Sequence, residues 1–290
     1  MNGMVDGSQT DPQILRALEL VHDPRSSNEH RQEASQYLEQ LKSQESAPYN
    51  GYLLAADRQQ PPVVRHFGLS LLENAIRHRW NDFSGEQSIA VREWVLKLAQ
   101  GVEKEDPLYI RNKIAQLWVE IAKRSWALDW MNMDELLVEL WVGSVAKKVL
   151  VLEVLETLSE NSFGKEDTIT ALRGSDLSKA CVEIFSPAHI MAEQFPRRDV
   201  NLNVRCGNEG WISRISDFLS WCTEQDQNDQ DVQLCALKVL SCLKSVVGWA
   251  VLSAIAATNC VPRICRALTS SQIVLQLVRL PIPRSRRGSG

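Results

Sequence analysis

The segment PPVVRHFGLSLLENAIRHRW, residues 61–80, predicts an amphipathic helix that begins at two prolines. Proline suits the first turn of a helix, because the N–H group that it lacks has no partner within the helix there. From Val64 onward, apolar residues recur at spacings of three and four, which is the period of one helix face. Gly68 lies mid-helix, where it costs about 1 kcal/mol relative to alanine. We therefore expect Gly68 to permit a close contact with a neighbouring helix.

Similar amphipathic segments lie on both sides of this helix and group into pairs. The helices expected around it are residues 11–22, 27–43, 49–57, 84–101, 108–124, 132–141 and 147–158. Two of them begin with capping boxes, in which a serine or asparagine is followed three residues later by glutamine or glutamate. Four pairs in about 160 residues give a period of about 40, which is typical of HEAT repeats. Each such pair must stack on its neighbours to bury its apolar face.

The pattern continues less regularly and then changes at the end of the chain. Further helices are expected at residues 176–185, 210–222, 231–247, 249–257 and 261–268. Residues 269–290 end in a basic sequence rich in proline, glycine and serine, and we expect this tail to lie outside the stack. The uncharged run 245–262 approaches the length of a membrane span, but Gly248, Asn259 and Pro262 interrupt it. A buried helix hairpin is the preferred interpretation of this run.

Composition and terminal sequence restrict the class of protein. The 290 residues are 44% hydrophobic and 23% charged, with a formal net charge of -4, which disfavours a globally basic nucleic-acid binder. Residues 1–10 predict a disordered tail, and the first residues resemble neither a secretory signal nor a transit peptide. The seven cysteines show no paired CxxC spacing and are expected to be free thiols in a reducing compartment. A nuclear or cytosolic protein is expected.

The chemistry-bearing motifs of common enzymes are absent from the sequence. It contains no GxxxxGK[ST], HExxH or GxSxG motif, so we expect no enzyme activity and assign no catalytic residue. The five histidines are not spaced with the cysteines as metal ligands, so no metal site is expected. The nine tryptophans mostly occupy apolar helix positions, which favours core packing over a stacking platform for single-stranded nucleic acid.

Three strings resemble one known family. They are RQEASQYLEQLK at 31–42, VRHFGLSLLENAIRHRW at 64–80 and IRNKIAQLWVEIAKRSWALDWMNMDELLVELW at 110–141. They are similar to the amino-terminal part of the importin-beta-like karyopherins, most of all the exportin-five (Msn5) class. The resemblance implies an all-α HEAT-repeat solenoid. It also implies importin-beta-like Ran-binding repeats over 11–163, further exportin-type repeats over 164–268, and a whole protein several times longer than this chain.

The resemblance also implies a function based on binding. Members of the family are nuclear transport receptors that shuttle between nucleus and cytoplasm, bind FG nucleoporins and do not insert into membranes. Exportins of this class bind Ran-GTP together with cargo, which is a phosphorylated protein or a structured RNA such as tRNA or pre-miRNA. No cofactor is implied, and GTP enters only through bound Ran. An importin-type receptor and a HEAT scaffold unrelated to transport remain alternatives.

The resemblance places the contacts with Ran on the inner helices of the first repeats. If the second helix of each pair lines this inner face, its polar side chains are the candidates for Ran binding. These residues are His66, Ser70, Glu73, Asn74, Arg77, Lys113, Gln116, Glu120 and Lys123.

Overall fold

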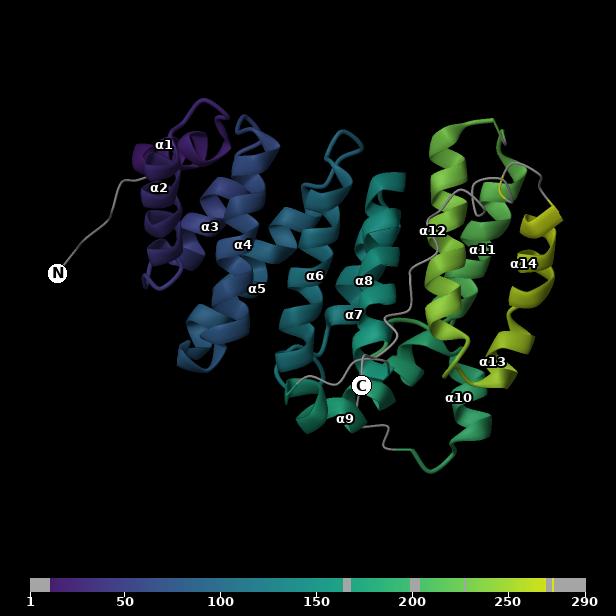
Figure 1. The fold of residues 1–290 in the computed structure, drawn as a ribbon. Coiled ribbons are helices and arrows are strands. Elements are labelled where there is room, and N and C mark those ends of the chain that lie inside the picture. Colours follow the sequence, from purple (N-terminus) through teal and green to yellow (C-terminus); the bar gives the residue numbers. More distant parts are fainter. Residues whose placement is uncertain (1–10, 164–167, 199–203, 227, 270–272, 274–290) are drawn as a thin grey trace, which may run out of the picture. The chain divides into compact units, whose positions relative to one another are not determined.

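The computed structural model describes residues 11–163, 168–198, 204–226, 228–269 and 273. These residues form α-helices α1–α14 and one 3-10 helix, η1, and none of them lies in a β-strand (Figure 1). The prediction of an all-α fold of HEAT type is confirmed. The expected tail 1–10 and most of the basic tail 269–290 lie outside the described residues.

The helices agree closely with the sequence pattern over the first half of the chain. In order, they are α1 (Pro12–His22), α2 (Asn28–Leu41), α3 (Ala47–Ala56), α4 (Pro62–His78), η1 (Trp80–Asp82), α5 (Gly85–Gln100), α6 (Leu108–Ser125), α7 (Met133–Trp141), α8 (Val145–Phe163), α9 (Thr168–Phe185), α10 (Ala188–Gln194), α11 (Trp211–Glu224), α12 (Gln230–Val246), α13 (Leu252–Ala257) and α14 (Cys260–Thr269). The short elements η1 and α10 were not predicted, because neither is long enough to show a helical period.

The chain forms two compact units. The first contains the described residues up to Ser125 together with Leu140–Leu150, and the second contains Trp126–Glu139 and the described residues from Val151 onward. In the first unit, α1 packs on α2, α3 on α4 and α5 on α6, as expected for consecutive pairs. The first helices α3 and α5 also contact each other, as do the second helices α4 and α6. This arrangement places the polar sides of α4 and α6 next to each other.

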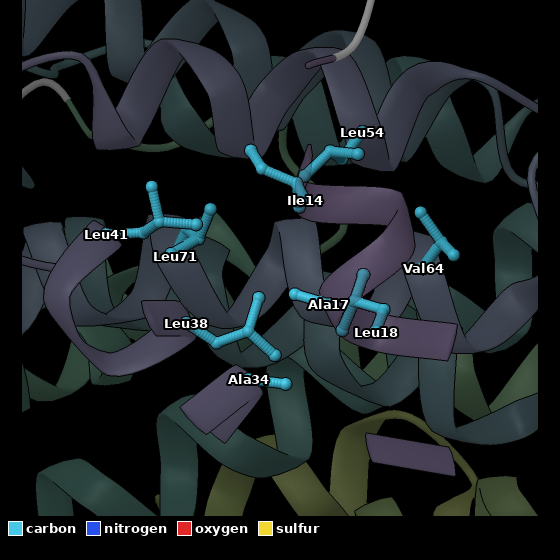
Figure 2. Packing of buried hydrophobic residues seen from close by; sticks show 9 residues of the cluster. All are labelled: Ile14, Ala17, Leu18, Ala34, Leu38, Leu41, Leu54, Val64 and Leu71. Carbon is cyan, nitrogen blue, oxygen red and sulfur yellow. The ribbon is translucent and has the colours of Figure 1, made fainter. Parts of the chain in front are cut away.

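The core of the first unit begins where the first two pairs meet. Figure 2 shows buried leucine, isoleucine, valine and alanine side chains from α1, α2, α3 and α4 packed together, including Ile14, Leu38 and Leu71. The predicted helix starts are confirmed at two places. Ser27 accepts a hydrogen bond from the N–H of His30 at 3.2 Å, and Ser84 and Gln87 form a reciprocal capping box.

Gly68 permits the close helix contact that the sequence predicts. A Cβ atom on Gly68 would lie 2.5 Å from the carbonyl oxygen of Gly51 and 2.7 Å from the Cβ of Leu54. Gly51 has the reciprocal relation, since its Cβ would lie 2.7 Å from the carbonyl oxygen of Gly68. Helices α3 and α4 therefore touch backbone to backbone, and this contact fixes their separation.

The second unit is held together by buried aromatic and polar groups. Asp134 of α7 accepts hydrogen bonds from the indole N–H of Trp211 and from the backbone N–H of Cys206, both at 2.5 Å. Burial raises the pKa of Asp134, although both donors oppose this effect. Lys238 of α12 forms ion pairs with Glu153 and Glu156 of α8.

All seven cysteines are free thiols, and five are buried, as expected of small hydrophobic residues.

The run 245–262 differs from the expected buried hairpin. It contains the end of α12, the short helix α13 and the start of α14. Leu252 is 79% exposed and Val261 is 54% exposed, so the prediction of burial is wrong for these residues. Asn259 has a positive φ of 53° between the two helices, a conformation that asparagine tolerates better than most residues. Within the described part of the chain, no helix is both long enough and apolar enough to cross a membrane.

Candidate binding face on α4 and α6

The nine residues predicted for Ran binding lie on two neighbouring helices of the first unit. Five are on α4 and four are on α6, and the two helices pack directly on each other. On each helix they recur at spacings of three and four residues and so share one stripe. We call the surface that carries these nine residues the α4–α6 face. The structure thus brings the predicted residues together, whereas their contact with Ran stays a prediction.

Ion pairs join the two helices across this face. Lys113 of α6 pairs with Glu73 of α4, and Arg77 of α4 pairs with Glu120 of α6 at 3.2 Å. Within α4, Arg77 also pairs with Glu73 at 3.4 Å. Lys113 and Glu73 are largely shielded from solvent, with side-chain exposures of 16% and 19%. Because a shielded pair is less screened by salt than a surface pair, these contacts stabilise the packing of α4 on α6.

Glu120 is the centre of the more buried part of this network. Its carboxylate accepts hydrogen bonds from Lys123 at 2.9 Å, from Arg124 at 2.7 Å and from Arg77 at 3.2 Å. Burial alone would raise the pKa of Glu120, but the hydrogen bonds from Lys123 and Arg124 and the charges of Lys123 and Arg77 together lower it. Glu120 is therefore ionised at neutral pH, which is the state in which it binds these cations.

The exposure of Glu120 and Lys123 was predicted wrongly. Both were expected among the polar side chains that line the inner face for contact with Ran, yet only 7% of Glu120 and 2% of Lys123 is accessible. Paired charges that satisfy one another can be buried at a helix interface, whereas the sequence pattern treats every charged residue as solvated. Arg124 was missed as a member of this network. Its position four residues after Glu120 was the available signal, because that spacing places a cation beside a glutamate.

Three uncharged residues of the face are accessible to a partner. Gln116 is exposed, and Ser70 and Asn74 are half-buried. The hydroxyl of Ser70 donates to the carbonyl oxygen of His66 at 3.0 Å, which leaves its lone pairs for an incoming donor. These three side chains can therefore form hydrogen bonds with a partner without breaking an ion pair.

His66 lies at the amino-terminal end of the face against an aromatic residue that sequence analysis did not single out. Its ring meets Tyr109 of α6 edge-on, with ring centroids 5.5 Å apart and planes at 73°. Burial lowers the pKa of His66, the nearby Lys113 lowers it further, and Glu73 opposes them. The imidazole is consequently neutral at pH 7. Tyr109 lies four residues before Lys113, on the same stripe, so its helical spacing was the available signal.

The opposite helices, α3 and α5, border a groove of about 430 Å³. Trp94 of α5 lies at its wall, stacked on Tyr52 with centroids 5.4 Å apart and tilted against Tyr49 at 5.7 Å. We call this cavity the α3–α5 groove. Its lining residues are Ser43, Glu45, Pro48, Tyr49, Arg79, Asp82, Phe83, Gln87, Ala90, Val91 and Trp94.

These features are those of a helical-repeat protein that works by binding. In the first unit, helices α4 and α6 carry a polar face and helices α3 and α5 border an aromatic groove. Such surfaces suit the binding of proteins or peptides over an extended area. Among the described residues, no three His, Cys, Asp or Glu side chains gather as ligands for a metal ion.

Comparison with known proteins identifies the family. Residues 34–120 match the Importin-beta N-terminal domain, and residues 107–186 match the Exportin 1-like protein family. Protein MSN5 of Saccharomyces cerevisiae is 30% identical over 273 residues, which cover 89% of this chain and 22% of that protein. Exportin-5 of Mus musculus is 25% identical over 284 residues, covering 95% of this chain and 22% of the relative. The chain belongs to the importin-beta-like karyopherins, in the class of these two relatives, and spans 22% of their length.

Proposed function

We propose that this chain is part of a nuclear export receptor that binds the GTP form of Ran through its α4–α6 face. The observation that carries the proposal is the match to the Importin-beta N-terminal domain over residues 34–120, which contain all of α4 and most of α6. The Exportin 1-like match over residues 107–186 favours an exportin over an importin. In an exportin, Ran-GTP and cargo bind together and strengthen each other's binding.

The proposed receptor works by binding and release, without catalysis and without a cofactor of its own. GTP takes part only as the nucleotide of bound Ran. The cargo is a phosphorylated protein or a structured RNA, and the receptor moves between nucleus and cytoplasm. A preformed polar face is suited to this task, because a receptor can distinguish two nucleotide states only through contacts that differ between them.

Nucleotide-selective binding is the first prediction. We expect the purified chain to bind Ran loaded with GTP more tightly than Ran loaded with GDP, as measured by titration calorimetry. Replacing Ser70, Asn74 and Gln116 together by alanine should weaken binding to Ran-GTP by at least about tenfold, since each lost interfacial hydrogen bond costs roughly 0.5–1.5 kcal/mol and tenfold corresponds to about 1.4 kcal/mol. These residues are chosen because they take part in none of the ion pairs described for the face, so folding should be preserved.

The control variant replaces Ile89, an exposed residue of α5, by alanine and should bind Ran-GTP as the unchanged chain does. Equal binding of the GTP and GDP forms, or no binding by a folded chain, would contradict the proposal and favour a helical scaffold unrelated to transport. If Ran-GTP expels cargo that the chain has bound, the receptor would be an importin.

We also propose that the α3–α5 groove binds the phenylalanine side chains of FG nucleoporins. The groove offers Tyr49, Phe83 and Trp94 as partners for an aromatic ring. Aromatic pairs contribute about 0.5–1.5 kcal/mol beyond the area they bury, so one ring in such a groove gives a weak contact that repeats along an FG chain can multiply.

A matched pair of tyrosines tests the groove separately from the α4–α6 face. Tyr49 borders the groove and is 48% exposed, whereas Tyr109 borders the face and is 49% exposed. We expect Tyr49→Ala to weaken binding of an FG-repeat peptide about threefold to tenfold, measured by NMR titration or surface plasmon resonance. Tyr109→Ala should leave that binding unchanged. Equal FG binding by both variants and the unchanged chain would rule out this groove as the site.

A further inference from the structure

Tyr109 is an exposed aromatic residue at the edge of the α4–α6 face. It lies in the first turn of α6, directly after Pro107 and Leu108, and 49% of it is accessible. Its spacing to Lys113 and Gln116 places it on the stripe that forms the face. Leu108, beside it in the chain, is 57% exposed. Two exposed side chains, one aliphatic and one aromatic, therefore lie in the first turn of α6.

The ring of Tyr109 contacts the ring of a residue on the neighbouring helix. The edge-on contact with His66 at 5.5 Å supports it from α4, the neighbouring helix. Because the imidazole of His66 is neutral at pH 7, covering this pair with a partner does not require the desolvation of a charge. Tyrosine also has few rotatable bonds, so fixing it in an interface costs little conformational entropy.

The charged residues of the face are poorly placed to supply most of the affinity. Glu73 and Lys113 are paired with each other, and the carboxylate of Glu120 already accepts from three cations of the same chain. A partner that bound Glu73, Lys113 or Glu120 directly would compete with the ion pairs that these groups already form. Such charges are better suited to steering an encounter and rejecting wrong partners than to adding affinity.

We propose that Tyr109 is the main anchor of the α4–α6 face and that it packs against an apolar side chain of the bound GTPase. This inference rests on the proposed function. It separates the face into an aromatic anchor at the amino-terminal end, uncharged hydrogen-bonding residues in the middle, and an ion-pair network that holds α4 and α6 together. Energetically dominant interface residues are often tyrosines surrounded by polar contacts that contribute little individually.

The experiment compares variants of Tyr109 in calorimetric titrations with Ran-GTP. Tyr109→Ala and Tyr109→Gln should both weaken binding by about 30-fold or more, whereas Tyr109→Phe should bind within about threefold of the unchanged chain, because it keeps the apolar ring. Ile89→Ala, at a residue of α5 that is 44% exposed and lies outside both the face and the groove, should not change the affinity. Thermal unfolding followed by circular dichroism should give the same midpoint for all variants, since the side chain is half exposed.

The outcomes separate the inference from the function on which it rests. If the unchanged chain selects Ran-GTP and the alanine and glutamine variants bind as tightly, the anchor is wrong and the proposed function stands. If phenylalanine weakens binding as much as alanine, the hydroxyl rather than the ring carries the interaction, and an apolar contact is ruled out. If the unchanged chain does not select Ran-GTP, both proposals fail together.

Discussion

Replacing Gly68 by alanine is expected to destabilise the chain by about 2 kcal/mol, even though alanine is the better helix former by about 1 kcal/mol. The added Cβ would lie 2.5 Å from the carbonyl oxygen of Gly51, 2.7 Å from the Cβ of Leu54 and 2.8 Å from the backbone nitrogen of Ala55. Two of these atoms belong to the backbone of α3, so no rotation of a side chain can relieve the contact. Helices α3 and α4 must move apart, which opens gaps in the core around them.

The size of the substituent should set the size of the effect. Gly68→Leu should cost more than 3 kcal/mol, since it adds three further carbon atoms to the same crowded site. Gly51→Ala should be destabilising for the reciprocal reason. The double variant Gly51→Ala, Gly68→Ala should cost less than the sum of the single changes, because the first substitution already separates the helices. Urea unfolding monitored by circular dichroism measures all four values.

Gly85 provides the matched control. It also lies in a helix of the first unit, at the start of α5, and a Cβ there would meet nothing within 4 Å. Gly85→Ala should be neutral or stabilise the chain by up to about 1 kcal/mol. If Gly68→Ala were equally neutral, α3 and α4 would not be in backbone contact at Gly51 and Gly68.

The elements of the first unit were predictable because their signals are local. The two prolines before α4, the Ser84–Gln87 capping box and the period of α6 each act within a few residues, and each element appears where these signals place it. Even the close contact at Gly68 was predictable, because glycine in the middle of a helix costs about 1 kcal/mol relative to alanine unless a close helix contact requires it. Its partner Gly51 was not singled out, since a sequence alone does not reveal which helix approaches.

The candidate face was predicted only in part, because burial of a charge depends on its partners. Periodicity correctly placed nine residues on one side of α4 and α6. It could not show that Arg77 and Arg124 converge on Glu120 from two helices, which is what permits Glu120 and Lys123 to be buried. It also passed over Tyr109, because an aromatic side chain was not counted among the polar residues of the inner face.

Replacing Glu120 by alanine should destabilise the chain by about 3–5 kcal/mol at pH 7, because the change removes the carboxylate to which three cations are bound. Lys123 is only 2% exposed and would lose the negative charge that compensates its own. Glu120→Gln should cost less than alanine, since the amide oxygen can still accept a hydrogen bond but carries no charge.

The control is Glu93→Ala, at an exposed glutamate of α5, which should change the free energy of unfolding by less than about 0.5 kcal/mol. Loss of Ran binding by Glu120→Ala would therefore reflect unfolding of the chain rather than loss of a contact with Ran.

The effect of Glu120 should depend on pH in a defined direction. The pKa of Glu120 in the folded chain lies below its ordinary value of 4.5, because the hydrogen bonds and charges of Lys123, Arg124 and Arg77 outweigh the opposing effect of burial. A group whose pKa is lowered by folding contributes stability above the unfolded pKa, and this contribution is lost as pH falls through the folded pKa. The difference in unfolding free energy between the unchanged chain and Glu120→Gln should thus be constant between pH 7 and about pH 5.5 and shrink below about pH 4.5. Urea titrations at pH 7, 5.5 and 3.5 measure it. A difference that grew on acidification would mean that Glu120 is protonated more readily in the folded chain than in the unfolded one, and that burial outweighs its three cationic partners.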